Sequence, residues 1–320
     1  MVPGSLSVKK LLVALVLLAA LGAAGFWLLT APFTYEALRG APDVTVATAP
    51  NLENGKTLFY AGGCTSCHAI PGQDDRTRLG GGLGLQSPFG TFYAPNISPH
   101  PRDGIGGWTV ASFIRAMREG VSPDGRHYYP AFPYTSYQRM AAQDLADVFA
   151  FLKTLPPVEG KVRDHDLPFP FNVRRGLGLW KLAFLDGKPI QPDPAKSAEW
   201  NRGRYLVEGP GHCAECHSPR AFTGAIVDGK RFSGGPDPEG KGFVPNITQD
   251  KAGLASWSKN DIAELLKTGF TPEYDAVGGS MAPVIKNTSQ LSDADRGAMA
   301  EYIKSLPAVA SPPRPPKKAE

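Results

Sequence analysis

The chain has 320 residues, of which 42% are hydrophobic and 20% charged, and its formal net charge is +4. This length is enough for two domains of ordinary size. The mild positive charge forms no basic stripe outside the C-terminal tail, so nucleic acid is not expected as a partner. Glycine and proline contribute 36 and 31 residues, a high share that indicates short elements joined by long loops.

An apolar segment near the N-terminus is the first predicted element. Lys9 and Lys10 precede an unbroken apolar run over residues 11–29, whose helical length approaches the thickness of a bilayer core. Lysines before the run predict that the N-terminus stays inside and the rest of the chain is exported. The alternative is a cleaved secretory signal, because the small residues at 19–25 could form a cleavage site. We favour an uncleaved transmembrane anchor over residues 1–30.

Two copies of a Cys-x-x-Cys-His motif use all four cysteines of the chain. They read Cys64-Thr65-Ser66-Cys67-His68 and Cys213-Ala214-Glu215-Cys216-His217. This is the attachment pattern of c-type haem. Two thiols form thioethers with one porphyrin, and the histidine that follows ligates the iron. A thioredoxin-like pair needs no such histidine, and a zinc site would recruit further ligands at matched spacing. We therefore predict two covalent haem c groups, with His68 and His217 as axial ligands.

The two motifs belong to an internal duplication with an offset of about 150 residues. Further landmarks recur at nearly the same offset. They are Asn96 and Asn246 in Pro-Asn-Ile, Trp108 and Trp257, Gly120 and Gly269, and Leu155-Pro156 and Leu306-Pro307. The landmarks predict two tandem all-α domains over residues 50–157 and 199–308, joined by a linker over 158–198. The linker is rich in aromatic residues and is expected to pack across the domain interface. The tail over 309–320 is expected to be disordered.

Each repeat is predicted to hold three main helices. The first precedes the Cys-x-x-Cys-His turn, the second follows the tryptophan, and the third ends at Pro156 or Pro307. Gly55 and Gly203 lie on the first helices. A glycine there either permits a close helix crossing or caps the helix N-terminus, and the sequence leaves both open.

The second axial ligand decides what each haem can do, because a six-coordinate His/Met haem transfers electrons whereas an open iron can react. In the second repeat the candidate is Met281, on a glycine-rich loop, since Met299 belongs to an apolar helix stripe. In the first repeat Phe132 stands where a Met-Pro would be expected. We favour Met140 there, because a loop residue can reach an iron. The alternatives are Met117 on the middle helix, His127, or an open position. If it is not a ligand, His127 is expected to be a solvated loop residue.

Several longer segments carry a family resemblance. They are residues 93–98 (YAPNIS), 104–108 (GIGGW), 113–120 (FIRAMREG), 129–134 (YPAFPY), 167–171 (LPFPF), 200–207 (WNRGRYLV) and 211–220 (GHCAECHSPR). From about Leu52 to Pro307, the chain resembles the multihaem cytochrome c subunits of bacterial membrane-bound dehydrogenases that face the periplasm and oxidise alcohols, sugars or aldehydes. The resemblance implies tandem cytochrome c domains. It also implies a quinoprotein or molybdenum-flavin dehydrogenase as electron donor, and a cytochrome, terminal oxidase or quinone as acceptor. Many such subunits carry three haems, whereas this chain has two motifs.

We interpret the chain as an electron-transfer protein or subunit, not an enzyme. We expect it at the bacterial inner membrane with its haem domains in the periplasm. The first alternative is a dihaem cytochrome c peroxidase, in which one haem opens to peroxide. A dihaem sulfur-compound dehydrogenase is less favoured, because it would place a cysteine or another unusual ligand at the active haem, and this chain has no cysteine to spare.

Overall fold

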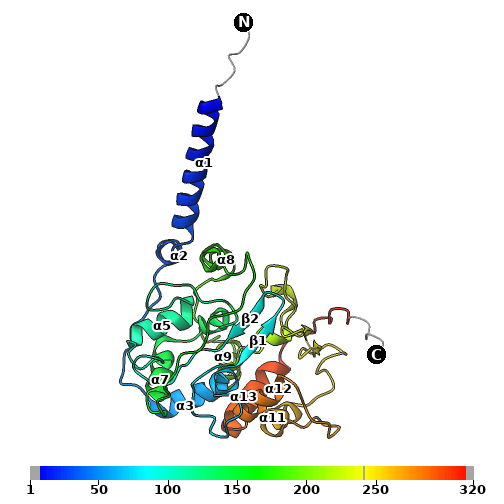
Figure 1. The fold of residues 1–320 in the computed structure, drawn as a ribbon. Helices are drawn as coiled ribbons and strands as arrows, with labels where there is room; N and C mark the ends of the chain where they lie inside the picture. Colours follow the sequence, from blue (N-terminus) through cyan, green and yellow to red (C-terminus); the bar gives the residue numbers. More distant parts are fainter. Residues whose placement is uncertain (1–7, 241, 315–320) are drawn as a thin grey trace.

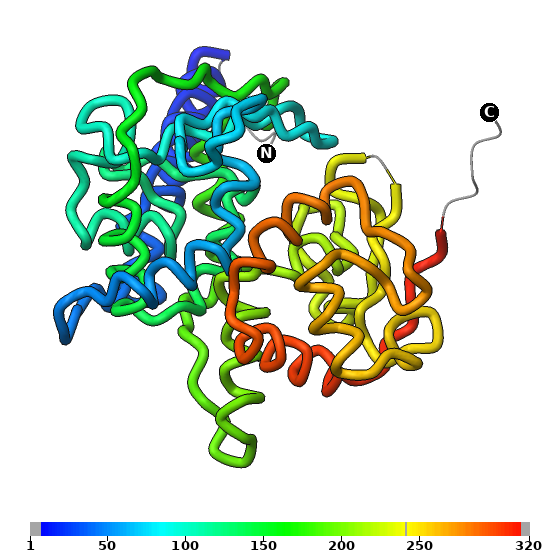
Figure 2. The backbone as a smooth tube through the Cα atoms, turned by 90° about the horizontal axis from the view of Figure 1, so that it is seen from below, coloured from blue at the N-terminus to red at the C-terminus, as the bar shows by residue number. Residues whose placement is uncertain are grey.

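The computed structural model describes residues 8–240 and 242–314. Helix α1 (Val8–Leu29) projects away from a globular body made mostly of short helices and loops (Figure 1). Figure 2 shows the two repeats as neighbouring bodies, the first in blue to green and the second in yellow to red. The predicted all-α class with two cytochrome-type domains after one apolar helix is confirmed.

Within the described residues, α1 is the one helix long and apolar enough to cross a membrane, and none of its side chains is buried. The short helix α2 (Pro32–Arg39) follows after a two-residue break, with proline in its first turn. Proline suits this position because the amide it lacks has no partner inside the helix. Residues 1–7 of the predicted anchor lie outside the described residues.

The first repeat contains five helices and one two-stranded sheet. They are α3 (Leu52–Ala61), α4 (Cys64–His68), β1 (Gly84–Ser87), β2 (Gly90–Tyr93), α5 (Val110–Glu119), α6 (Tyr134–Tyr137) and α7 (Ala142–Leu152). Asn51 caps the start of helix α3, where its side chain accepts the Glu53 and Asn54 amides, and Gly120, with a φ of 60°, caps the end of α5. A side-chain acceptor before a helix and a left-handed glycine after it are the expected boundary signals.

The second repeat has the same order of elements. They are α9 (Ala198–Glu208), α10 (Ala214–His217), a 3₁₀ turn (Asp228–Lys230), β3 (Gly235–Pro236), β4 (Phe243–Val244), α11 (Lys259–Thr268), α12 (Met281–Thr288) and α13 (Asp293–Lys304). Ser258 and Asp261 form a reciprocal capping box at the start of α11. Both sheets are antiparallel pairs of short strands that the sequence analysis did not predict.

The glycines on the first helices mark close helix crossings. A β-carbon built on Gly55 would lie 2.6 Å from the carbonyl carbon of Asp147 and 3.0 Å from the Cβ of Phe151. A β-carbon on Gly203 would lie 2.5 Å from the carbonyl carbon of Ala298 and 3.0 Å from the Cβ of Tyr302. Helix α3 therefore crosses α7, and α9 crosses α13, at a distance that only glycine permits. The caps are instead Asn51 and Ser197, so the capping alternative is wrong.

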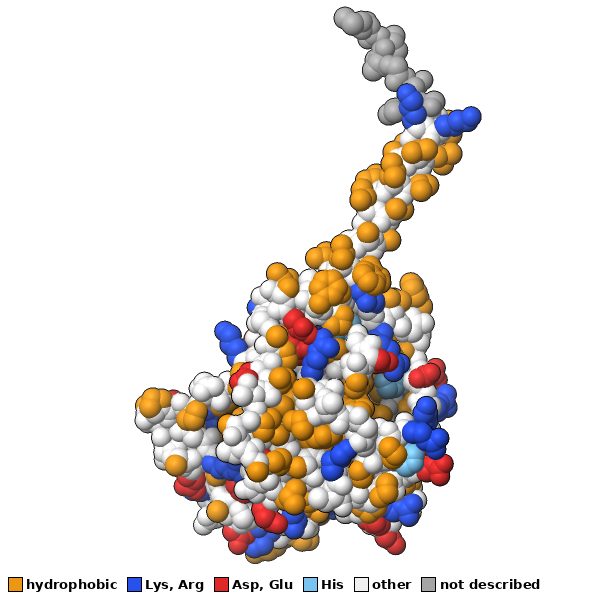
Figure 3. Space-filling view, turned by 90° about the vertical axis from the view of Figure 1, so that its left-hand side faces the viewer, with side chains coloured by type: hydrophobic (Ala, Val, Ile, Leu, Met, Phe, Trp, Pro, Cys, Tyr) orange, Lys and Arg blue, Asp and Glu red, His pale blue; other side chains and the backbone are white. Residues whose placement is uncertain are grey.

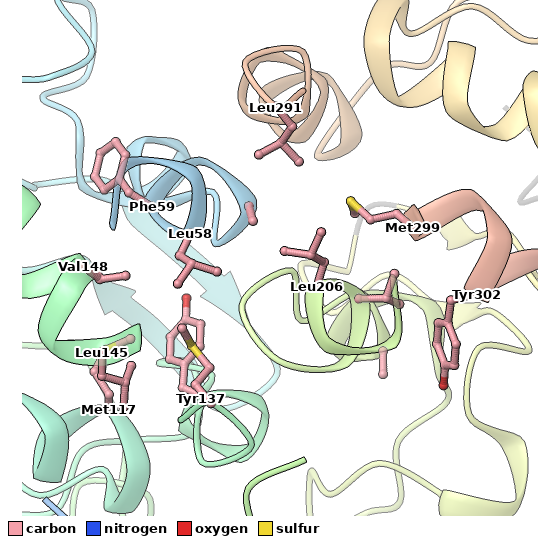
Figure 4. Close-up of a cluster of buried hydrophobic side chains, with 14 of the residues drawn as sticks. Leu58, Phe59, Met117, Tyr137, Leu145, Val148, Leu206, Leu291, Met299 and Tyr302 are labelled. Carbon is pink, nitrogen blue, oxygen red and sulfur yellow. The ribbon is translucent and has the colours of Figure 1, made fainter. Parts of the chain in front are cut away.

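A continuous hydrophobic core runs through both repeats. Figure 4 shows Leu58 of α3 near Val148 of α7 in the first repeat, and Leu206 of α9 near Met299 of α13 in the second. These side chains are almost fully buried. The core therefore fixes the helix pairs that precede each Cys-x-x-Cys-His turn.

The linker contains a 3₁₀ turn (Arg174–Gly176) and α8 (Leu177–Phe184). Helix α8 packs on α2, and the Trp180 indole donates a 2.9 Å hydrogen bond to the Thr223 carbonyl of the second repeat. The tail differs from expectation at its start, because Asn246 donates to the Val309 carbonyl and to Ser311 Oγ. Residues 315–320 of the predicted disordered tail lie outside the described residues.

Candidate haem sites

The two predicted axial histidines share one geometry. His68 Nδ1 lies 2.8 Å from the Pro95 carbonyl oxygen, and His217 Nδ1 lies 2.8 Å from the Pro245 carbonyl oxygen. A carbonyl only accepts hydrogen bonds, so Nδ1 is the protonated nitrogen and Nε2 keeps its lone pair. Burial lowers the pKa of both rings, which favours the neutral form that a metal needs. A backbone acceptor on the second nitrogen is the usual support of a metal-bound histidine.

An asparagine holds each proline loop in place. Asn96 Nδ2 donates to the carbonyls of Val158 (2.8 Å) and Gly160 (3.0 Å), while its Oδ1 accepts the Ser98 amide at 2.9 Å. In the second repeat, Asn246 makes the equivalent bonds to residues after α13 and to the Thr248 amide. Each buried side chain thus ties the loop that faces the histidine to the segment after the last helix.

A glycine connects each histidine to the same loop. The Gly81 amide donates to the His68 carbonyl, and the Gly234 amide donates to the His217 carbonyl, both at 2.8 Å. Both glycines have positive φ, 72° and 77°. A β-carbon on Gly81 would lie 2.5 Å from the Pro95 carbonyl oxygen, so the close approach of turn and loop requires glycine.

The residues around each motif fit a covalently attached porphyrin. Cys64 and Cys213 pack against the hydrophobic core, and half-buried apolar residues at equivalent positions of the two repeats pack against the same core. These are Ile97 and Trp108 in the first repeat, and Ile247 and Trp257 in the second. Burial raises the pKa of the Cys64 and Cys213 thiols to about 12, so both thiols are protonated at neutral pH before a porphyrin is attached. No cluster of three or more His, Cys, Asp or Glu side chains suited to a lone metal ion occurs within the described residues.

The candidate distal methionines have different surroundings. Met140 lies between α6 and α7 and is 1% exposed. Met281 is the first residue of α12, not a loop residue as expected, and it packs at the edge of the core. Helix α12 contacts α3 and α4 of the other repeat.

The alternative ligands are also buried. Met117 on α5 and Met299 on α13 belong to the same hydrophobic core as Met140, so burial does not distinguish the three methionines. His127 is also buried, with Nε2 2.8 Å from the Thr30 carbonyl and Nδ1 3.0 Å from Lys181 Nζ. Both of its ring nitrogens therefore have partners at the base of α1 and on α8, and the expectation that His127 is a solvated loop residue is wrong. Phe132 packs on the Tyr137 ring, with the ring centroids 5.5 Å apart.

The two sites are joined by reciprocal contacts. From the first turn, Thr65 Oγ1 donates to Asn287 Oδ1 at 2.9 Å, and Asn287 Nδ2 donates to Ser66 Oγ at 3.0 Å. From the second turn, Glu215 accepts hydrogen bonds from Thr135 (2.5 Å) and Ser136 (2.9 Å) of α6. Each attachment turn thus binds the short helix of the other repeat that adjoins the candidate distal methionine.

Sequence reasoning missed the roles of several residues. The Pro-Asn-Ile segments served only as markers of the repeat, although Pro95 and Pro245 orient the histidines. The repeat offset does not reveal Gly81 and Gly234, because the spacing from histidine to glycine is 13 residues in one repeat and 17 in the other. The common signal was available in the duplication itself, since each glycine precedes its Pro-Asn-Ile segment.

Comparison with known proteins agrees with this geometry. The cytochrome c family model matches residues 52–156 and 201–307. A protein named diheme cytochrome c-type from Cereibacter sphaeroides is 51% identical over 92% of this chain and 97% of its own length. The fructose dehydrogenase cytochrome subunit of Gluconobacter japonicus is 39% identical over 84% of this chain and 55% of its own length. The cytochrome c subunit of the quinone-dependent alcohol dehydrogenase from Gluconobacter oxydans is 36% identical over 84% of this chain and 58% of its own length.

The match over both repeats accords with the paired histidine sites and with the four cysteines in attachment motifs. The prediction of two haem c groups is thereby confirmed. The chain belongs to the cytochrome c family, as a protein with two cytochrome c domains.

Proposed function

We propose that this chain carries single electrons from a dehydrogenase partner, through its two haem sites, to a respiratory acceptor. The observation that carries the proposal is the repeated histidine geometry, the same 2.8 Å contact to a proline carbonyl in both domains. Two equally supported sites suit a relay, whereas a peroxidase needs two sites with different tasks. The relatives include cytochrome subunits of fructose and alcohol dehydrogenases. This supports a dehydrogenase as donor.

The chain's own residues hold and tune the redox group. The cysteines would attach it, and Nε2 of His68 and His217 would ligate the iron, which supplies one-electron chemistry. We propose Met281 and Met140 as the opposite ligands. A thioether ligand raises the reduction potential and closes the coordination sphere. Hydrogen bonds from Nδ1 to the proline carbonyls keep each imidazole in one orientation, so the site needs little rearrangement when its charge changes.

The reciprocal contacts support electron exchange between the sites without domain motion. Thr65 of the first attachment turn donates to Asn287 of α12, and Thr135 of α6 donates to Glu215 of the second attachment turn, so each turn is bound by the other repeat. Glu215 is buried, and its ion pair with Arg220 at 2.7 Å compensates its charge. We infer that the two repeats work as one rigid unit.

We also propose that α1 remains attached as an anchor in the bacterial inner membrane, with the haem domains in the periplasm. Its length and apolar composition support a membrane span, and the lysines at its start support export of the rest of the chain.

Matched leucine variants test the ligand assignment. Met140→Leu and Met117→Leu remove one thioether each at similar side-chain volume, so both variants should fold. We expect Met140→Leu to admit carbon monoxide at one reduced haem and lower its potential, while Met117→Leu changes neither. Met281→Leu and Met299→Leu form the same pair in the second domain. If Met117→Leu opened the first site and Met140→Leu did not, the assignment of Met140 would be wrong.

Peroxide turnover separates electron transfer from the peroxidase alternative. We expect the native protein to show two low-spin ferric haems and no catalytic reduction of peroxide. A full equivalent of high-spin haem together with rapid peroxide reduction would contradict the proposed function.

A further inference from the structure

The end of helix α1 is fixed to the first haem domain. Thr30, just after α1, is fully buried, and its carbonyl accepts the 2.8 Å hydrogen bond from His127 Nε2. Gly178 on α8 lies against the same residue, because a β-carbon there would be 2.5 Å from the Thr30 carbonyl oxygen. Arg175 donates to the Trp27 carbonyl, and its guanidinium lies 4.5 Å from the centre of the Trp27 ring. The helix is therefore clamped at its base and is not a flexible tether.

Large apolar side chains are exposed on the elements that surround this base. Helices α2 and α8 pack together beside the end of α1 (Figure 1), and Figure 3 shows hydrophobic side chains gathered where α1 meets the body. We call the following residues the apolar collar: Phe33 and Leu38 on α2, Leu179 and Phe184 on α8, and Phe169 and Phe171 in the segment before it. Phe169 is 80% exposed and Phe33 is 55% exposed. Exposed aromatic residues in this number mark an interaction surface.

The charge of this surface selects its partner. Residues 167–185 contain no aspartate or glutamate. Their cations outside the core are the half-buried Arg174 and Arg175, because Lys181 is buried against the Gly120 carbonyl and His127. Arg174 and Arg175 each lie over an aromatic ring, those of Tyr129 and Trp27 respectively. Aromatic and basic residues next to a membrane span are typical of the headgroup region, where anionic lipids attract the cations.

We propose that the apolar collar lies in the headgroup region of the anionic bilayer that α1 spans, and that this contact holds the first haem domain on the membrane in one orientation. This inference rests on the proposed anchor. Continuity with α1 commits the surface to lipid, because a span that ends in a rigid clamp brings α2 and α8 down to the same membrane surface. Helix α8 also contacts the second repeat through Trp180 and Thr223. Contact between the collar and the bilayer therefore fixes the orientation of both haem domains.

Spin labels on the complete dihaem protein test the contact between the apolar collar and the bilayer. Single cysteines at Phe169→Cys and Leu179→Cys carry the nitroxide, and Phe270→Cys is the matched control. Phe270 is a 51% exposed phenylalanine on the second domain. The labelled proteins are placed in nanodiscs containing phosphatidylglycerol, with the haems reduced. Collision rates are then measured with oxygen, which partitions into lipid, and with a water-soluble nickel chelate.

We expect labels 169 and 179 to collide several-fold less with the nickel chelate than label 270, and several-fold more with oxygen. Equal accessibility of all three labels, in protein that floats with the nanodiscs, would show that the collar does not contact the bilayer. The proposed membrane anchor would stand. If the protein failed to float with the nanodiscs, both the proposed membrane anchor and the contact of the collar with the bilayer would be refuted.

Discussion

Replacement of Gly203 by alanine tests the helix crossing that supports the second haem site. The added β-carbon would lie 2.5 Å from the Ala298 carbonyl carbon and 3.0 Å from the Tyr302 Cβ. The Ala298 carbonyl oxygen would lie nearer still, at 1.8 Å. An ordinary carbon contact is about 3.5–4.0 Å, so α9 and α13 must separate by at least about 1 Å. A gap of that size forfeits roughly a quarter to a half of the local packing energy.

The cost follows from the side chains at this crossing. Leu206, Val207 and Met299 are almost fully buried, and each contributes about 1.5–3 kcal/mol through burial. A loss of about 1 kcal/mol from each gives about 3 kcal/mol. Alanine returns about 1 kcal/mol, because it is the better helix former. We therefore expect Gly203→Ala to lower the free energy of unfolding by about 2 kcal/mol.

The control lies in the partner helix. A β-carbon on Gly297 of α13 would meet only Glu199 Oε1, at 3.7 Å. Gly297→Ala should therefore stabilise the protein by about 0.5–1 kcal/mol. The assay is guanidinium unfolding of the dihaem protein in detergent, followed by far-UV circular dichroism. If Gly203→Ala unfolded at the same or a higher denaturant concentration than Gly297→Ala, the reasoning on the close crossing would be refuted.

Three further predictions concern the sites and their surroundings. Gly81→Ala should shift the reduction potential of one haem in a redox titration, because it disturbs the loop that faces His68. The control is Gly72→Ala, which has a similar φ of 76° but no neighbour within 4 Å of its β-carbon, and it should leave the potential unchanged. Equal shifts in both variants would argue against a role for the contact between Gly81 and the Pro95 loop. Burial, followed by the charge of Lys181, lowers the pKa of His127 to about 4. The stability that neutral His127 contributes is therefore complete above pH 6.5 and is lost as the pH falls toward 4, by about 2 kcal/mol between pH 7 and 5. His127→Gln should abolish that part of the pH dependence of unfolding. An unchanged pH profile in this variant would contradict the lowered pKa of His127. A double-mutant cycle of Thr65→Val and Asn287→Leu should give a coupling of about 1 kcal/mol in unfolding experiments, and additive effects would show that the interface bond contributes nothing.

The sequence predicted the parts of the fold that depend on local chemistry. The attachment motifs, the main helices of each repeat and the apolar span all follow from short-range spacing or composition. The sequence alone does not separate the two roles of the glycines on the first helices, because a close crossing depends on where a second helix lies. The built β-carbon positions at Gly55 and Gly203 decide between the two interpretations.

The contacts between distant segments could not be predicted in this way. Pro95 meets His68 across 27 residues, and Asn287 meets Thr65 across 222. Such pairs depend on how loops and domains pack, and no periodicity records them. His127 was expected to be a solvated loop residue for the same reason, since its partners lie on α8 and at the end of α1. The distal ligands Met281 and Met140 stay predictions.

The most direct test is an optical redox titration of the purified intact chain in which the electrons added are counted. We expect the uptake of two electrons per polypeptide, in one-electron steps, with the absorption bands of low-spin c-type haem. Uptake of fewer than two electrons per polypeptide would contradict the claim that both repeats hold a haem that relays electrons. Haem that acid extraction removes from the protein would contradict the claim that the haems are covalently bound.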